Sequence, residues 1–131
     1  AVSLFGVLGV FVGGGVGAWC RFAADAFLKS TLGSVAFIRT MLINLAGSFA
    51  LGVLTGWAST AGSTDVEHWI LLVGGTGFLG GFTTFSTAMV EVATLAREGR
   101  VGIALFLWLG QAVLGLLVAW AGLLLGVLSA A

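Results

Sequence analysis

The sequence contains four long runs without a charged side chain, and these runs constrain the fold more than any other feature. They extend over residues 1–20, 40–64, 69–90 and 101–131. A helix that crosses a bilayer needs about 20 mostly apolar residues, and each run meets that length. We therefore expect an all-α integral membrane protein with a single four-helix transmembrane domain over residues 1–131. The spans are placed at about 2–28, 36–58, 69–96 and 101–128.

Composition excludes the other broad classes of protein. The chain is 60% hydrophobic and 8% charged, it contains no proline, and its mean hydropathy is +1.20. A soluble domain of 131 residues could not bury so much apolar surface. Five Lys and Arg balance five acids, so no basic face suggests a nucleic acid partner. The first run has no basic residue before it and three more runs after it, so we do not expect a cleaved signal peptide.

The basic residues predict the orientation in the membrane. All five lie in residues 21–39 and 91–100, which are the first and third connections, and with four spans these connections share one side. Because cytoplasmic connections are enriched in Lys and Arg, both termini are predicted outside, with the chain in the cell's inner (plasma) membrane. Arg21, Asp25 and Lys29 are spaced four apart, so the first helix is expected to continue past the membrane surface.

Glycines four residues apart predict close contacts between helices. Small residues at this spacing leave a helix face on which a second backbone can approach. Three such pairs occur in the spans: Gly13 with Gly17, Gly52 with Gly56, and Gly122 with Gly126.

Polar residues inside the spans are few, and each is a candidate functional residue. Thr40, Asn44 and Ser48 are four apart and form one stripe along the second span, while the fourth span offers Gln111. Hydrogen bonds between helices that only aid packing explain this stripe equally well.

The third span contains the segment GGTGFLGGFTTFST, residues 74–87. Its five glycines predict an interrupted helix, and such a break survives in hydrocarbon only where protein, water or an ion satisfies the freed backbone groups. The half-helix before the break presents carbonyls, which suit a cation. The half-helix after it presents N–H groups and hydroxyls, which suit an anion. The edge of the Phe85 ring also complements an anion. A packing kink is the alternative.

The sequence offers little for catalysis. His68 stands alone in a polar connection, Cys20 has no partner cysteine, and Asp25 and Glu91 are expected to be solvated near the interface. The glycine-rich segment follows no strand and lacks the lysine of a phosphate-binding loop. We therefore do not expect an enzyme.

Four stretches, in order and spacing, resemble the CrcB/Fluc family of fluoride channels: GGGVGAWCRF, TMLINLAGSFALG, GFLGGFTTFST and REGR. The resemblance implies a passive fluoride-selective channel that lets cytoplasmic fluoride out. It also implies a dual-topology-type antiparallel dimer with two pores, embedded in membrane lipid, and a structural sodium ion at the centre of the dimer interface.

The resemblance assigns roles to individual residues. The backbone carbonyls of Gly80 and Thr83 would bind sodium, and the same pair from the partner would complete the site. Phe85 matches the first pore-lining phenylalanine and Asn44 the pore asparagine. The remaining residues expected along the fluoride pathway are Arg21 in the vestibule, Glu91 after the third motif, and the polar positions Thr40, Thr84, Thr87, Ser86, Ser48 and Gln111.

Three positions depart from the family pattern. Ala88 stands where the second pore phenylalanine belongs, and hydroxyl positions of the fourth span fall on Gln111 and Gly115. A homodimer would lack the second phenylalanine in both pores. Together with the strong Lys and Arg bias, this gap suggests one half of a heterodimer whose subunits have fixed, opposite orientations.

Two other functions remain open. A small multidrug-resistance-type, proton-coupled exporter has similar length and span number, but it needs an acid deep in the first span, and residues 1–20 contain none. A non-conducting partner subunit that supports another chain's pore is the second alternative.

Overall fold

The computed structural model describes residues 3–33, 35–62 and 64–131. Its elements are α1 (Leu4–Leu32), α2 (Ala36–Ala61), α3 (Asp65–Trp69), η1 (Ile70–Leu79), α4 (Gly80–Phe82), α5 (Phe85–Arg97) and α6 (Val101–Ala130). Four helices are long and apolar enough to cross a membrane, with the segments from α3 to α5 together forming the third. This confirms the all-helical membrane fold. Residue 2, the expected start of the first span, lies outside the described part.

Local sequence explains where the helices begin and end. The hydroxyl of Ser3 accepts a hydrogen bond from the N–H of Gly6 and caps α1. That helix runs without interruption to Leu32, as the charged stripe predicted, and stops at Gly33, whose φ of 86° suits glycine. Thr64 and Glu67 form a capping box at the start of α3. The first and third long helices therefore start or stop at residues suited to those positions.

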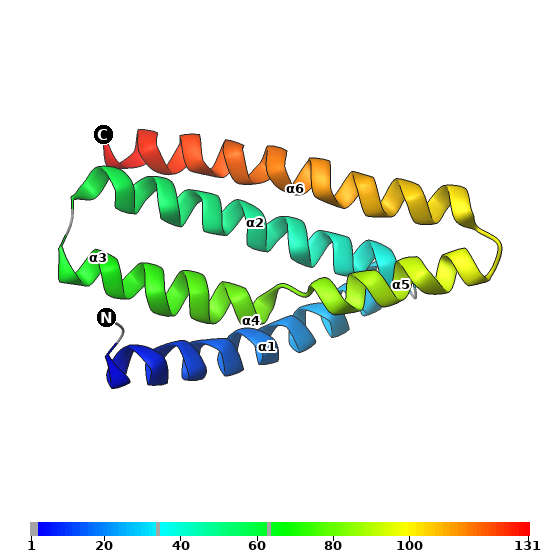
Figure 1. Ribbon diagram of the computed structural model, residues 1–131, viewed down its shortest axis with the longest axis horizontal. Coiled ribbons are helices and arrows are strands. Elements are labelled where there is room, and N and C mark those ends of the chain that lie inside the picture. Colours follow the sequence, from blue (N-terminus) through cyan, green and yellow to red (C-terminus); the bar gives the residue numbers. More distant parts are fainter. Residues whose placement is uncertain (1–2, 34, 63) are drawn as a thin grey trace.

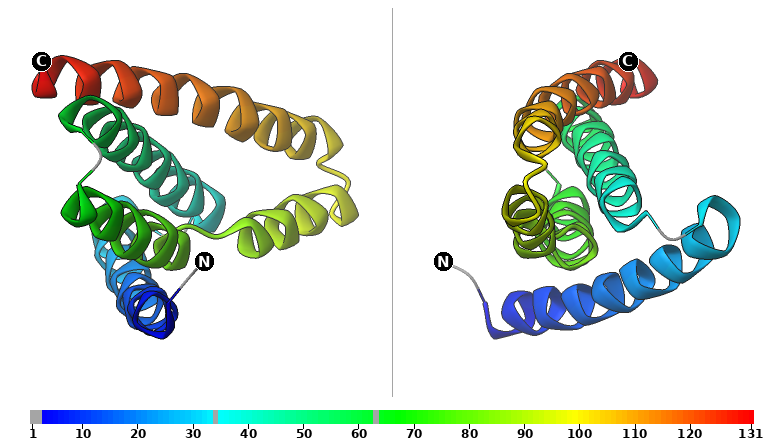
Figure 2. Two further views of the ribbon diagram at one scale, coloured as in Figure 1. Left: turned by 60° about the vertical axis from the view of Figure 1, so that its left-hand side comes forward. Right: turned by 90° about the vertical axis from the view of Figure 1, so that its right-hand side faces the viewer.

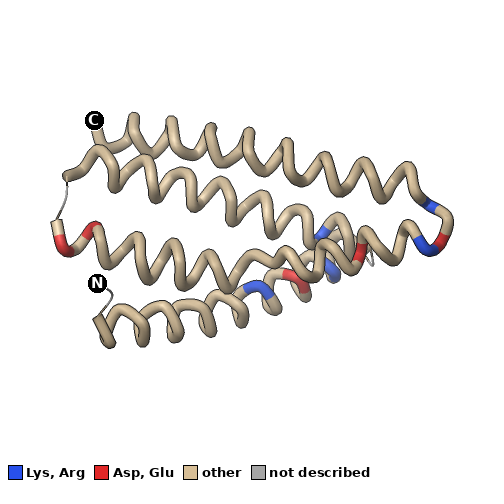
Figure 3. The backbone as a smooth tube through the Cα atoms, viewed as in Figure 1, with Lys and Arg blue, Asp and Glu red and all other residues tan. Residues whose placement is uncertain are grey.

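The helices lie side by side with both described ends of the chain at one end of the molecule (Figure 1). α2 packs against α6, and α1 packs mainly against η1 and α4, while two further views show α1 crossing beneath the other helices (Figure 2). The Lys and Arg residues lie between the middle of the molecule and the end opposite the termini (Figure 3). Among the described residues, the charged side chains at the terminal end are the acids Asp65 and Glu67 of α3.

The glycine pairs make the close contacts that their spacing predicted. A Cβ placed on Gly52 or Gly56 would overlap backbone atoms of Ala119 or Leu123 on α6. On the α1 side, a Cβ on Gly17 would overlap the backbone of Phe78 in η1. Gly122, Gly126 and Gly13 meet backbone atoms in the same way. These contacts join the helices in two pairs, α2 with α6 and α1 with the first half of the third helix.

The break in the third helix lies beyond the glycines. All five glycines of residues 74–87 are in helical segments, η1 and α4, and η1 has π-helical hydrogen bonding. The chain leaves the helix at Thr83 (φ −81°, ψ 159°) and Thr84 (φ −146°, ψ 120°). Glycine has a low intrinsic helix propensity, but here packing overrides it, since Gly77 and Gly81 let η1 and α4 approach the backbone of α1. The prediction of a break was right, but its assignment to the glycines was wrong.

Candidate ion pathway at the break in the third helix

The amide of Asn44 closes the break. Its Nδ2 donates to the carbonyl of Thr84 at 2.8 Å, and its Oδ1 accepts from the N–H of Thr84 at 2.8 Å. Asn44 is on α2, so this pair of bonds ties the extended residues of the third helix to the neighbouring helix. The freed backbone groups of Thr84 are thereby satisfied by protein, which is what a break within hydrocarbon requires.

The carbonyls before the break lose their helical partners. In a continuous α-helix the N–H of Thr84 would bond the carbonyl of Gly80, but here it bonds Asn44. The Thr83 carbonyl accepts from Nη1 of Arg21 at 3.4 Å. A Cβ on Gly80 would meet no atom within 4 Å, so this stretch borders open space. Carbonyl oxygens beside such space are suitable ligands for a hard monovalent cation.

Hydroxyls crowd the first turn of α5. Thr84 caps this helix, because its Oγ1 accepts from the N–H of Thr87 at 3.2 Å. The same hydroxyl lies 3.1 Å from Oγ1 of Thr87 and 3.4 Å from Oγ of Ser86. Phe85 projects from this turn with 76% of its surface exposed. An aromatic ring and three hydroxyls therefore meet at one helix N-terminus, as the sequence predicted.

A groove of about 610 Å³ runs between α2, the third helix and α6, and we call it the central groove. Asn44 and Ser48 of the polar stripe line it, and Gln111 lines it from α6. Ala88 and Gly115 also line the groove, so together with Gln111 all three departures from the family pattern lie along one surface. Gly80, Thr83, Thr84 and Phe85 complete the set of predicted residues there.

A second cavity, of about 320 Å³, lies between α1, α2 and α5 at the basic end, and we call it the vestibule cavity. Arg21, Thr40, Thr87 and Glu91 line it. Thr40 donates to Oε1 of Glu91 at 2.8 Å, so the first member of the polar stripe points toward α5. Thr84 lines both this cavity and the central groove. The break therefore lies between the two cavities, with Thr84 in the wall of both.

The predicted site residues thus form two groups that meet at Thr84. Those with a place in the central groove are Gly80, Thr83, Phe85, Asn44, Ser48 and Gln111. Those in the vestibule cavity are Arg21, Thr40, Thr87 and Glu91. Ser86 lines neither space, and it touches the site through the hydroxyl of Thr84.

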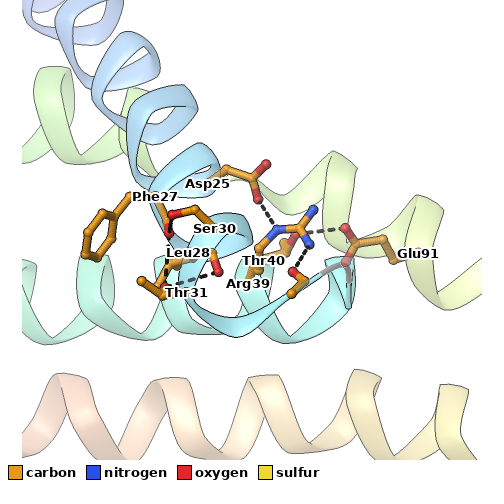
Figure 4. A network of polar contacts seen from close by, with 9 residues as sticks. Asp25, Phe27, Leu28, Ser30, Thr31, Arg39, Thr40 and Glu91 are labelled. Carbon is orange, nitrogen blue, oxygen red and sulfur yellow. Dashed lines mark hydrogen bonds and ion pairs between the residues drawn. The ribbon is translucent and has the colours of Figure 1, made fainter.

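Sequence reasoning missed the second basic residue of the vestibule cavity, Arg39. Its guanidinium donates from Nε to Oδ1 of Asp25 at 2.8 Å and from Nη1 to the carbonyl of Gly33 at 3.0 Å (Figure 4). Arg39 directly precedes Thr40 and therefore extends the polar stripe toward the basic end. That adjacency was the available signal, but the pairing with Asp25 depends on how the chain turns between α1 and α2.

Comparisons with known proteins agree with this architecture. The family model described as CrcB-like protein, Camphor Resistance (CrcB), matches residues 8–123. A protein of Nitrobacter hamburgensis named fluoride-specific ion channel FluC 2 is 39% identical over 116 residues, which cover 88% of this chain and 92% of that protein. Fluoride-specific ion channel FluC 1 of Leifsonia xyli subsp. xyli is 41% identical over 125 residues, covering 95% of this chain and 89% of that protein.

A third relative, fluoride-specific ion channel FluC of Gloeobacter violaceus, is 38% identical over 116 residues, or 88% of this chain and 90% of that protein. The matches extend over all four helices and include the break at Thr83 and Thr84. The chain is therefore a multi-pass membrane protein that belongs to the CrcB family.

Proposed function

We propose that the chain is a subunit of a passive, fluoride-selective channel through which cytoplasmic fluoride leaves the cell. The observation that carries the proposal is the helix break at Thr84. Thr84 lines both the central groove and the vestibule cavity, and the Phe85 ring lines the groove beside it. The names of the relatives, fluoride-specific ion channel, support the choice of ion. Hydrogen fluoride is a weak acid that crosses membranes as a neutral molecule and dissociates inside. The trapped anion then needs its own exit.

The arrangement suggests how the anion would pass. Arg21 in the vestibule cavity would attract it, and the hydroxyls of Thr40, Thr84 and Thr87 would replace part of its water shell. The Phe85 ring edge would then offer its partial positive charge. A pathway built from hydroxyls and ring edges, with few full charges, binds an anion weakly enough for release.

A second subunit would complete the site. Amide and hydroxyl side chains are among the groups that line the central groove. Exposing such a group to lipid hydrocarbon without a hydrogen-bond partner costs several kcal/mol. Together with the 76% exposure of Phe85, this favours an antiparallel partner that covers the groove. Gly80 and Thr83 line that groove, and their backbone carbonyls, with the same pair from the partner, would hold a sodium ion. Lipid would surround the outer faces of α1 and α6.

We further propose that the partner is a homologous chain of opposite orientation. All five Lys and Arg lie between the middle of the molecule and one end, which favours a single orientation with both termini outside the plasma membrane. Ala88 and Gly115 leave the groove without a second phenylalanine and a hydroxyl. A partner that supplies these groups would give the pair one complete pore.

The alternative functions are less well supported. The described part of α1 before Arg21 carries no acid, whereas a proton-coupled exporter needs one there. A non-conducting supporting subunit has one observation in its favour, because Ala88 is only 2% exposed and offers no ring to a pore.

Fluoride efflux from liposomes tests the proposal. The chain, alone and with its homologous partner, is reconstituted and efflux is followed with a fluoride electrode. Phe85→Ile should reduce efflux at least tenfold while subunit assembly is retained. Phe11→Ile, which alters an equally exposed ring on α1, should leave efflux unchanged. Efflux that is insensitive to Phe85→Ile would favour the supporting role, and absence of fluoride efflux in every combination would refute the channel.

A further inference from the structure

The vestibule cavity contains a second guanidinium group, that of Arg39. Four charged residues line this cavity: Arg21, Arg39, Asp25 and Glu91. Their formal charges cancel. Without Arg39 the cavity would carry one excess negative charge, which opposes the entry of an anion, and without Asp25 it would carry one excess positive charge.

The ion pair of Arg39 with Asp25 is asymmetric. The side chain of Arg39 is 9% exposed, whereas that of Asp25 is 42% exposed. Water screens the carboxylate at the rim more strongly than the buried guanidinium, so the positive end of the pair dominates inside the cavity.

Two acceptors fix the orientation of Arg39. Nε is bound by Asp25 and Nη1 by the carbonyl of Gly33, which follows the C-terminus of α1. The negative end of that helix dipole also favours a cation there. In the described part of the chain these bonds use Nε and Nη1, so the N–H groups of Nη2 remain for a ligand.

The opposing charge in the cavity is Glu91. Its Oε1 accepts from Thr40, while its Oε2 is buried and has no hydrogen-bond partner among the described residues. An anion that enters past this carboxylate needs compensation from more than Arg21, whose Nη1 is already directed to the Thr83 carbonyl.

We propose that Arg39 is a second anion-attracting residue of the vestibule cavity and that Asp25 both positions it and attenuates its charge. This inference rests on the proposed function, since it concerns fluoride entering the same pathway. It makes Asp25 and Arg39 opposite in effect on the anion, although they are partners in one ion pair.

That opposition separates the proposal from a purely structural clamp between α1 and α2. If the pair served only to hold the two helices, removal of either partner would lower activity in the same direction. If the pair tunes the field, Arg39→Met should weaken fluoride entry and Asp25→Asn should strengthen it.

The experiment compares Arg39→Met, Asp25→Asn, the double variant and Lys29→Met in the reconstituted assembly. Lys29 is a matched control, because it is an exposed basic residue one helical turn from Asp25 on α1 and does not line the cavity. Efflux is measured against fluoride concentration at low and high ionic strength, and fluoride binding is measured separately by ¹⁹F NMR on the purified assembly.

We expect Arg39→Met to raise the half-saturating fluoride concentration on the order of threefold to tenfold, as for one partly screened unit charge nearby. Asp25→Asn should lower it by about twofold, since its charge is the better screened. The double variant should lie between Arg39→Met and the wild type. Lys29→Met should match the wild type, and high ionic strength should reduce all differences.

A parallel loss in Arg39→Met and Asp25→Asn, or an equal effect of Lys29→Met, would overturn the proposal. If Arg39→Met fails to assemble, Arg39→Lys can be tested in its place, because lysine keeps the positive charge. Fluoride entry in Arg39→Lys that is as weak as in Arg39→Met would also overturn the proposal. The NMR measurement separates the two claims. If the variants bind fluoride with the expected order of affinities but none gives efflux, the channel is refuted and the role of Arg39 is retained. If Arg39→Met binds fluoride as the wild type does, the role of Arg39 is refuted whether or not efflux occurs.

Discussion

The side chain of Asn44 replaces the helical hydrogen bonds that the main chain loses at Thr84. It donates to the Thr84 carbonyl and accepts from the Thr84 N–H, each at 2.8 Å. One amide thus serves as donor and acceptor to the same residue across two helices. Asparagine is suited to this position because a carboxylate could only accept and a hydroxyl could not reach both groups at once.

Replacement of Asn44 by alanine should destabilise the fold and abolish the pathway. Two backbone groups would lose their partners, at about 1–3 kcal/mol each. Unfolding in detergent, followed by circular dichroism, measures this loss. Ser59→Ala is the control, because that hydroxyl bonds only the Gly56 carbonyl of its own helix. Equal stability of Asn44→Ala and Ser59→Ala would contradict the stabilising role of the two hydrogen bonds between Asn44 and Thr84.

The glycines of α2 and α6 should not tolerate even a methyl group. A Cβ on Gly52 or Gly122 would overlap a carbonyl of the facing helix, and overpacking of this kind typically costs about 1–3 kcal/mol. We expect Gly52→Ala and Gly122→Ala to lower the melting temperature.

Gly110→Ala is the matched control on α6, since a Cβ there would meet no atom within 4 Å. Alanine is the better helix former by up to about 1 kcal/mol, so this variant should be as stable as the wild type or more so. A similar loss in all three variants would contradict this explanation, because Gly110 makes no such contact with a facing helix.

The large features of this fold could be predicted from sequence because they depend on local patterns. Charge-free runs gave the four spans, which the helices Leu4–Leu32, Ala36–Ala61, Asp65–Arg97 and Val101–Ala130 confirm. Spacing of glycines identified the contact faces. The expected ends were short by a few residues, because caps such as the Thr64 and Glu67 capping box extend helices beyond the apolar runs.

The position of the break and the role of Arg39 depend on three-dimensional packing. Low helix propensity placed the break among the glycines, but those residues stay helical where α1 packs on them. The extended conformation falls on Thr83 and Thr84, where Asn44 is within reach. Arg39 and Asp25 are 14 residues apart and meet only through the turn between α1 and α2. No periodic pattern encodes that contact.

Gly80 and Gly81 are adjacent but should respond differently to substitution. A Cβ on Gly81 would overlap the backbone of Gly14, whereas one on Gly80 would meet nothing within the chain. Gly81→Ala should therefore lower the stability of the subunit itself. Gly80→Ala should leave the subunit folded. It should weaken assembly if a partner subunit packs against this open position beside a shared sodium site, because the added methyl group would then obstruct the approach.

Assembly is measured by size-exclusion chromatography with sodium and with a bulky organic cation in its place. We expect wild-type assembly to be weaker without sodium, and the sodium dependence to be reduced in Gly80→Ala. Assembly that is identical in the two cations for the wild type would argue against the sodium site.

Introduction of a phenylalanine at Ala88 should not restore a pore within this chain. Ala88 is 2% exposed, so the larger ring would have to displace its neighbours, at about 1–3 kcal/mol. We expect Ala88→Phe to be less stable than the wild type and to give no efflux without a partner. Ala93→Phe, at an exposed position of the same helix, is the control. Robust efflux from Ala88→Phe alone would mean that the chain forms a working homodimer.

The orientation of the chain can be tested with single cysteines at opposite ends. In a Cys20→Ser background, Asp65→Cys and Glu98→Cys replace exposed acids, and acids contribute little to membrane orientation, so neither change should alter it. Because all Lys and Arg lie toward the end that holds Glu98, an impermeant maleimide should label Asp65→Cys in intact cells. Glu98→Cys should react only after lysis. Comparable labelling of both in intact cells would show that the chain inserts in two orientations, and the argument for a fixed-orientation partner would fail.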